Sequence, residues 1–138
     1  MFTYHGWIEL RHSELEKDFI ETKVSYPAYR DRLLSIAEEL LKISESDFNI
    51  SNINLSVIAG TNGIIAVHMS GQHNHYSFGV EDLLNWIKEK APLSHGLIYL
   101  TDSEVDYMNG QYKILRLAQN SISEMDDIFL SPFHKMIE

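Results

Sequence analysis

The chain has 138 residues, of which 44% are hydrophobic and 22% charged, so its composition is that of an ordinary globular protein. This length predicts a single domain over residues 1–138, large enough to bury a core without disulfides or metals. The net charge of −9 argues against nucleic-acid binding, because an acidic surface repels phosphates, and it would attract a basic partner.

The sequence also predicts a cytoplasmic protein. It has no cysteine, which excludes disulfides, thiolate metal sites and a cysteine nucleophile. No apolar run approaches the roughly 18–20 residues that cross a bilayer. The first residues lack the basic start and apolar core of a signal peptide. We therefore expect no contact with a membrane.

A strand and a helix are the first predicted elements. Residues 2–10 predict a strand, in which Gly6 indicates a bulge or a close backbone approach. Ser25 and Pro27 then mark a helix start, because serine caps helices and proline is tolerated in the first turn. Apolar residues recur at helical spacing to about Ile43, so this helix should pack one face on a core.

A hairpin is predicted next, over residues 53–69. Two apolar, β-branched runs flank Asn62-Gly63, which is the strongest short-range signal for a two-stranded hairpin. The second run leads into a polar, histidine-rich segment, residues 70–75. With Gly71 allowing a turn, we expect this segment to join the hairpin to the element that follows.

The rest of the chain predicts one helix and two strands. Apolar residues at positions i, i+3, i+4 and i+7 indicate a helix from Val80 that Pro92 ends. Residues 97–100 predict a short buried strand and residues 112–117 a final strand. Residues 121–138 form a tail that is first acidic and then partly apolar.

The order β-α-β-β-α-β-β predicts an α+β fold. It corresponds to the ferredoxin-like split βαβ arrangement with an extra C-terminal strand. We expect a largely antiparallel sheet of about five strands with both helices on one face.

The histidine-rich segment is a candidate metal site. His73 and His75 alternate, so on a strand their imidazoles would share a face, and His68 could add a third ligand for zinc. No His-Glu-x-x-His motif or suitably spaced carboxylate accompanies them. We favour the other interpretation, in which Asn74 and His75 stabilise a turn or contact a partner.

No catalytic motif is present. The sequence lacks a glycine-rich phosphate loop, a Gly-x-Ser-x-Gly motif and an evident pair of catalytic carboxylates. We therefore expect a protein that binds without catalysis or cofactor, with Trp7 in the core. Two alternatives stay open: a metal-dependent enzyme using the three histidines, and a ligand-sensing domain with an apolar cavity lined by Trp7 and Trp86.

Two acidic segments are candidates for contact with a partner. Neither matches the calcium-loop pattern, and neither has lysines at helical spacing to neutralise it. They are either solvated loops or a docking surface for a basic partner. Their carboxylates are Asp102, Glu104 and Asp106 in the first segment, and Glu124, Asp126 and Asp127 in the second.

Four short motifs stand in an order that resembles the immunity protein 7 family of bacterial polymorphic toxin systems. They are Tyr4-His5-Gly6-Trp7, Ser70-Gly71 with Asn74-His75, Ala91-Pro92-x-Ser94-x-Gly96-Leu97-Ile98-Tyr99, and Asp127-x-Phe129-Leu130-Ser131-Pro132. Ala118-Gln119-Asn120 departs from the family pattern of a basic residue and glycine. His134-Lys135-Met136 replaces a more proline-rich ending.

The resemblance implies a small cytosolic α+β protein, encoded beside a toxin gene, that binds and neutralises the cognate toxin domain. An acidic, non-catalytic domain is also what an inhibitor of a basic toxin domain requires, since complementary charge speeds capture. The class of toxin, the docking face and the choice between monomer and dimer stay open.

Overall fold

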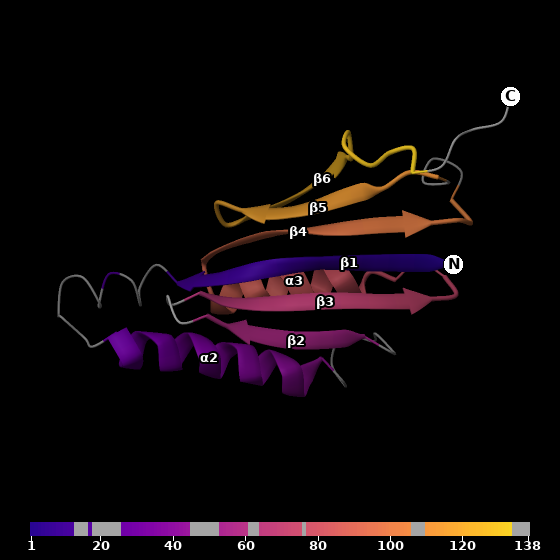
Figure 1. Cartoon of the computed structure of the whole chain (residues 1–138). Helices are drawn as coiled ribbons and strands as arrows, with labels where there is room; N and C mark the ends of the chain where they lie inside the picture. The colour runs from indigo at the N-terminus through magenta and orange to yellow at the C-terminus, as the bar shows by residue number, and fades with distance from the viewer. Residues whose placement is uncertain are drawn as a thin grey trace, which may run out of the picture.

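A computed structural model describes residues 1–12, 17, 26–44, 53–60, 64–75, 77–105 and 110–133. Its elements, labelled in Figure 1, are β1 (Phe2–His12), α2 (Tyr26–Ile43), β2 (Asn54–Ala59), β3 (Ile65–His73), α3 (Gly79–Lys90), β4 (Leu93–Asp102), β5 (Lys113–Ala118) and β6 (Ser121–Asp126).

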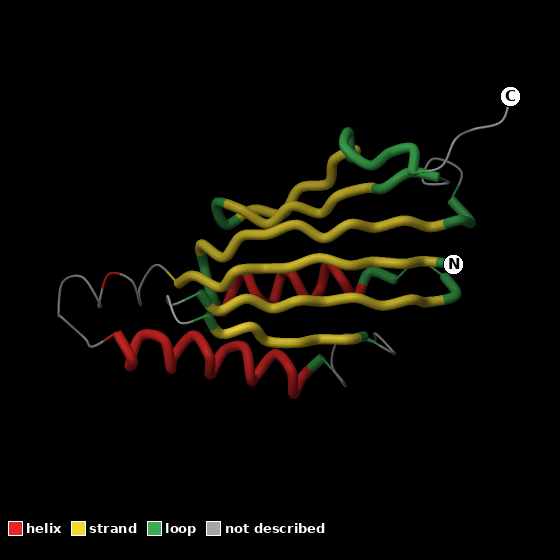
Figure 2. The backbone as a smooth tube through the Cα atoms, in the orientation of Figure 1, coloured by secondary structure: helices red, strands yellow, loops and turns green. Residues whose placement is uncertain are grey.

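The strands form one open antiparallel sheet in the order β2-β3-β1-β4-β5-β6. The four strands from β2 to β4 have the order of the split βαβ arrangement, because β3 lies between β2 and β1. Strands β5 and β6 extend the sheet beyond β4 (Figure 2). The predicted fold class is therefore confirmed.

A sixth strand exceeds the expected count of about five. Residues 121–126, predicted to belong to the tail, pair with β5 through a two-residue turn at Gln119 and Asn120. Both turn residues have positive φ, 52° and 56°, which is the backbone of a type I′ hairpin. The sequence does not predict a hairpin here, because this turn conformation usually carries Asn-Gly rather than Gln-Asn.

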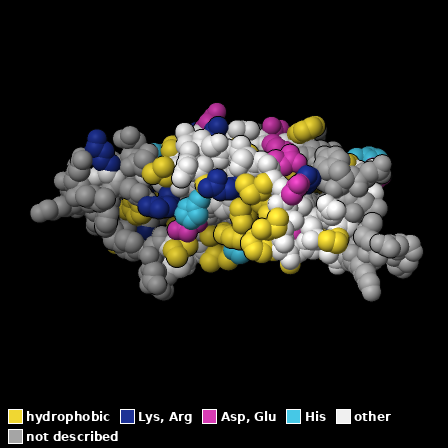
Figure 3. Space-filling view, turned by 90° about the horizontal axis from the view of Figure 1, so that it is seen from above, with side chains coloured by type: hydrophobic (Ala, Val, Ile, Leu, Met, Phe, Trp, Pro, Cys, Tyr) yellow, Lys and Arg dark blue, Asp and Glu magenta, His cyan; other side chains and the backbone are white. Residues whose placement is uncertain are grey.

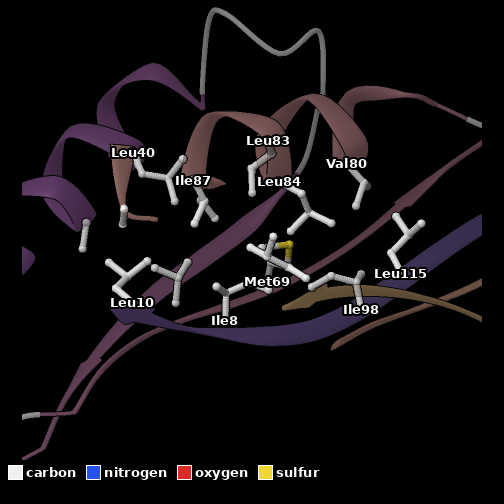
Figure 4. Close-up of a cluster of buried hydrophobic side chains, with 14 of the residues drawn as sticks. Ile8, Leu10, Leu40, Met69, Val80, Leu83, Leu84, Ile87, Ile98 and Leu115 are labelled. Atoms are coloured by element: carbon white, nitrogen blue, oxygen red, sulfur yellow. The ribbon is translucent and has the colours of Figure 1, made fainter. Parts of the chain in front are cut away.

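Both helices cover the same face of the sheet. Strand β1 shows this by alternation: Phe2, Tyr4 and Ile8 are buried beneath the helices, while Trp7 lies on the other face. Figure 4 shows side chains of α2 and α3, such as Leu40 and Leu83, pointing at the same side of the sheet. Among the described helices, none is long and apolar enough to cross a membrane.

The central strands approach closely at two glycines. A Cβ atom on Gly6 would lie 2.1 Å from the carbonyl oxygen of Leu97, and one on Gly96 would lie 2.0 Å from that of Trp7. Only glycine fits at either position without moving backbone. The close approach predicted for Gly6 is confirmed, and it fixes β1 firmly against β4.

Candidate functional site

One end of the sheet collects most of the candidate partner-contacting residues. Because neighbouring strands are antiparallel, the ends of β3, β4 and β6 meet where β1 and β5 begin, near the label N in Figure 1. We call this region the acidic end; its described members are Asn74, His75, Asp102, Glu104, Glu124, Asp126 and Asp127. Asp106 lies outside the described residues.

His75 and Glu104 are brought together from separate segments. The His75 Nδ1 atom lies 2.9 Å from Glu104 Oε2, and both side chains are exposed. This hydrogen bond and the nearby imidazole charge lower the pKa of Glu104 below its usual range. Asn74 is exposed beside them. These residues are accessible to a partner.

Asp102 serves the interior of the fold. Its residue is only 1% exposed, and its carboxylate accepts a hydrogen bond of 2.9 Å from the backbone N–H of Glu104. The same carboxylate lies 3.8 Å from the amino group of Met1. These contacts hold the end of β4 beside the start of β1 and turn the Asp102 carboxylate away from solvent.

Asp127 organises the segment after β6, residues 127–133, which we call the C-terminal loop. Its carboxylate accepts hydrogen bonds from the backbone N–H groups of Phe129 and Leu130, at 3.1 and 2.7 Å, and from the Ser131 hydroxyl at 3.0 Å. Burial raises the pKa of Asp127, but these donors outweigh it and leave the pKa lowered. The ionised carboxylate thus fixes the loop.

Glu124 and Asp126 are exposed on β6. The Asp126 carboxylate accepts a hydrogen bond from Lys113 on the neighbouring strand. Among the described residues of the acidic end, the exposed carboxylates are these two and Glu104.

The C-terminal loop presents large apolar side chains to solvent. Ile128 and Phe129 are each 80% exposed, and Leu130 is 53% exposed. The loop is anchored on its inner side, where the Phe133 N–H donates to the Gly110 carbonyl at 2.8 Å. Figure 3 looks onto the β6 edge and shows hydrophobic side chains gathered near the middle of this side, with acidic and basic side chains around them.

Beside the loop, the helix-free face of the sheet is hollowed. The hollow has a volume of about 630 Å³ and draws its lining from four strands and the C-terminal loop. No carboxylate, lysine or arginine of the described residues lines it. Its exposed-face lining includes His5, Trp7, Ser56, His68, Tyr99 and Leu130.

Trp7 belongs to this hollow and not to the core, so its predicted placement was wrong. It is 42% exposed, because Ile8 next to it takes the core position and alternation turns Trp7 to the other face. Trp86 lies on α3, on the helix-covered side of the sheet. The two tryptophans therefore do not line a common cavity, as the ligand-sensing alternative required.

The three histidines of the metal hypothesis are not brought together. His68 lines the hollow, whereas His73 stacks on Tyr4 of the core, with ring centroids 5.5 Å apart. His75 pairs with Glu104 beyond the strand end. Within the described ranges, no three His, Asp or Glu side chains could hold a metal ion.

Tyr4 of the first family motif and Gly71 of the second are neighbours in the sheet. The two residues are paired across β1 and β3, and a Cβ atom on Gly71 would lie 2.3 Å from the Tyr4 hydroxyl. Burial raises the pKa of Tyr4 to about 12, so its hydroxyl stays neutral, 3.2 Å from His73 Nε2. These positions support the sheet.

Ser94 of the third motif is likewise structural. Its hydroxyl donates to the Ala91 carbonyl at 2.7 Å and accepts from the Arg11 N–H at 3.0 Å. It therefore ties the end of α3 to the end of β1.

The hollow and the apolar loop were not identified from the sequence. Alternation within β1 and β4 could have placed His5, Trp7 and Tyr99 on one face, but their neighbours on β2 and β3 depend on register. The apolar residues after Asp127 carried no periodic signal that distinguishes an exposed loop from a packed one.

The chain matches a known protein family. The family model described as Immunity protein 7 matches residues 1–138, the full length of the chain. Comparisons with curated proteins and with solved structures found no match.

Proposed function

This chain belongs to the immunity protein 7 family, and from that premise we propose that it binds and neutralises the cognate toxin domain of a bacterial polymorphic toxin system without catalysis. The family match over residues 1–138 supports this proposal. We further propose that the protein acts in the cytoplasm of the cell that it protects.

The observation that supports a basic partner is the set of exposed carboxylates toward one end of the sheet. Glu104 follows β4, and Glu124 and Asp126 lie in the second half of β6. With a net charge of −9, the protein would attract a basic domain and orient it during approach. Docking there would cover a toxin surface that receives an anionic substrate.

The buried members of the acidic end would act indirectly. Asp102 and Asp127 are 1% and 5% exposed, and both accept backbone hydrogen bonds. We propose that they shape the turns that carry the exposed groups. Direct contact falls to the exposed carboxylates, to Asn74 and to His75.

The test is a binding measurement with the toxin domain encoded beside the gene for this chain. The domain is purified with an inactivating substitution, and association is followed by biolayer interferometry between about 20 and 150 mM salt, a range over which screening shortens the reach of charge. We expect a stable complex whose association rate falls as salt rises. Absence of a complex would contradict the proposed function, and a salt-independent rate would contradict the charge mechanism.

A further inference from the structure

The C-terminal loop is an exposed apolar surface that is held in place. Its outermost side chains, Ile128 and Phe129, are each 80% exposed, yet the backbone beneath them is fixed by the Asp127 carboxylate. Tyr112 anchors the loop to β5, since its N–H donates to the Ser131 hydroxyl at 2.7 Å. A preordered loop loses little entropy on binding, which favours its use as an anchor.

Leu130 joins this loop to the hollow on the helix-free face. Its side chain lines the hollow together with His5 and Trp7. Aromatic side chains lie along the same surface. The rings of His5 and Tyr99 are stacked with centroids 6.1 Å apart, and the ring centroids of Tyr112 and Phe133 are 5.0 Å apart. Loop and hollow thus form one continuous surface with a projecting part and a receiving part.

The charge of the protein indicates which kind of partner fits this surface. Its centre is uncharged, whereas Glu104 is exposed at one end of the sheet and the protein carries a net charge of −9. An apolar centre beside a charged rim is the usual anatomy of a protein interface. A second copy of this chain would bring two acidic ends together, so a basic domain fits better.

We infer that the toxin domain docks on the C-terminal loop and the adjoining hollow, placing an apolar side chain in the hollow and a basic side chain against Glu104. This inference rests on the proposed function and assigns its interface. Phe129 projects into the toxin domain, and Trp7 and Leu130 contact the side chain that the toxin inserts.

Two variants test the two parts of the surface. Phe129→Ser removes the projecting ring, and Ser56→Trp fills the hollow from the exposed side of β2. Affinity for the inactivated toxin domain is measured by titration calorimetry. Each variant should bind about 10- to 100-fold more weakly, as expected when the centre of an interface is disturbed.

Matched controls make the same substitutions elsewhere. Phe78→Ser removes a phenylalanine that is 72% exposed before α3, and Ser121→Trp adds a tryptophan at the far end of β6. Both controls should bind like the wild type. Circular dichroism and thermal melting of all four variants establish that each is folded.

The outcomes separate the inference from the function on which it rests. If the wild type binds and either test variant binds equally well, the joint surface is wrong while the proposed function stands. If the wild type does not bind the toxin domain, the proposed function itself is contradicted. If sedimentation shows that Phe129→Ser dissociates a homodimer without weakening toxin binding, the surface is a self-association site and the inference is overturned.

Discussion

At the scale of single residues, Gly6 and Asp127 hold the backbone around the candidate site in place. Gly6 lets β1 approach β4, and Asp127 fixes the C-terminal loop through three hydrogen bonds. Neither group needs to touch a partner. Their effects on function would pass through the position of the strands and the shape of the loop.

Gly6→Ala should destabilise the fold. The new methyl group would lie 2.1 Å from the Leu97 carbonyl oxygen, and backbone cannot rotate away as a side chain can. We expect the free energy of unfolding to fall by about 1–3 kcal/mol, as for other overpacked interiors. Urea denaturation measures it, with Thr3→Ala on the same strand as the control. An unchanged midpoint for Gly6→Ala would show that β1 and β4 can separate freely.

Asp127→Ala should loosen the C-terminal loop. It leaves the N–H groups of Phe129 and Leu130 without their carboxylate acceptor, which costs about 1–3 kcal/mol when such donors stay buried. Asp126→Ala, at the neighbouring exposed carboxylate, is the control and should change stability by less than about 0.5 kcal/mol. Equal effects of the two substitutions would contradict the organising role of Asp127.

The stabilisation by Asp127 should depend on pH. Its pKa is lowered in the folded protein, so its contribution is fully present above the unfolded-state pKa of about 3.9. The contribution is lost as the pH falls through the folded-state pKa. The difference in stability between wild type and Asp127→Ala should therefore be largest near pH 7 and shrink in acid. Denaturation curves at several pH values test this, and a difference that grows in acid would reverse the sign.

At the scale of elements, the β5–β6 hairpin has a local sequence that agrees poorly with its structure. Gln119 and Asn120 both adopt positive φ, which costs non-glycine residues about 1–2 kcal/mol each, less for asparagine. Pairing of β6 with β5 and packing of Ile122 on the core offset this cost. The hairpin therefore depends on its tertiary context.

Replacing the turn by Asn-Gly should stabilise the protein. The double variant Gln119→Asn with Asn120→Gly matches the residues that a type I′ turn prefers. We expect a gain of about 0.5–1 kcal/mol in the free energy of unfolding, seen as a higher melting temperature. Ser121→Gly is the control, since glycine inside the adjoining strand should lower stability. A loss of stability in the double variant would show that the turn is not under strain.

At the scale of the whole molecule, we expect the distribution of charge to affect partner binding more than the net charge does. Acidic residues lie both on the helices, as Glu38 and Glu89 do, and at the acidic end, as Glu104 and Glu124 do. If long-range attraction alone guides the partner, every exposed carboxylate should contribute equally to the association rate. If docking uses the acidic end, its carboxylates should contribute more to that rate than those on the helices.

Charge reversal separates these two cases. Glu104→Lys with Glu124→Lys and the control pair Glu38→Lys with Glu89→Lys change the net charge equally. The first pair should slow association with the toxin domain about 10-fold or more at low salt, and the control pair markedly less. Stopped-flow or interferometry rates measure this. Equal slowing by the two pairs would contradict an interface at the acidic end.

The periodicity signals of the sequence were sufficient for the fold class and for every described element except β6. Helical spacing located both helices, and β-branched runs located the hairpin strands, because these signals act over a few residues. The same local signals placed Asp102 and Asp127 among exposed acids and Trp7 in the core, since they do not state which face is covered.

Tertiary structure decided what depends on register between distant strands. It added β6 to the sheet, brought His75 to Glu104, and buried Asp102 and Asp127 as internal hydrogen-bond acceptors. It also joined Leu130 to His5 and Trp7 around one hollow. A sequence by itself determines which side chains alternate along each strand, whereas pairing among strands determines which of them become neighbours.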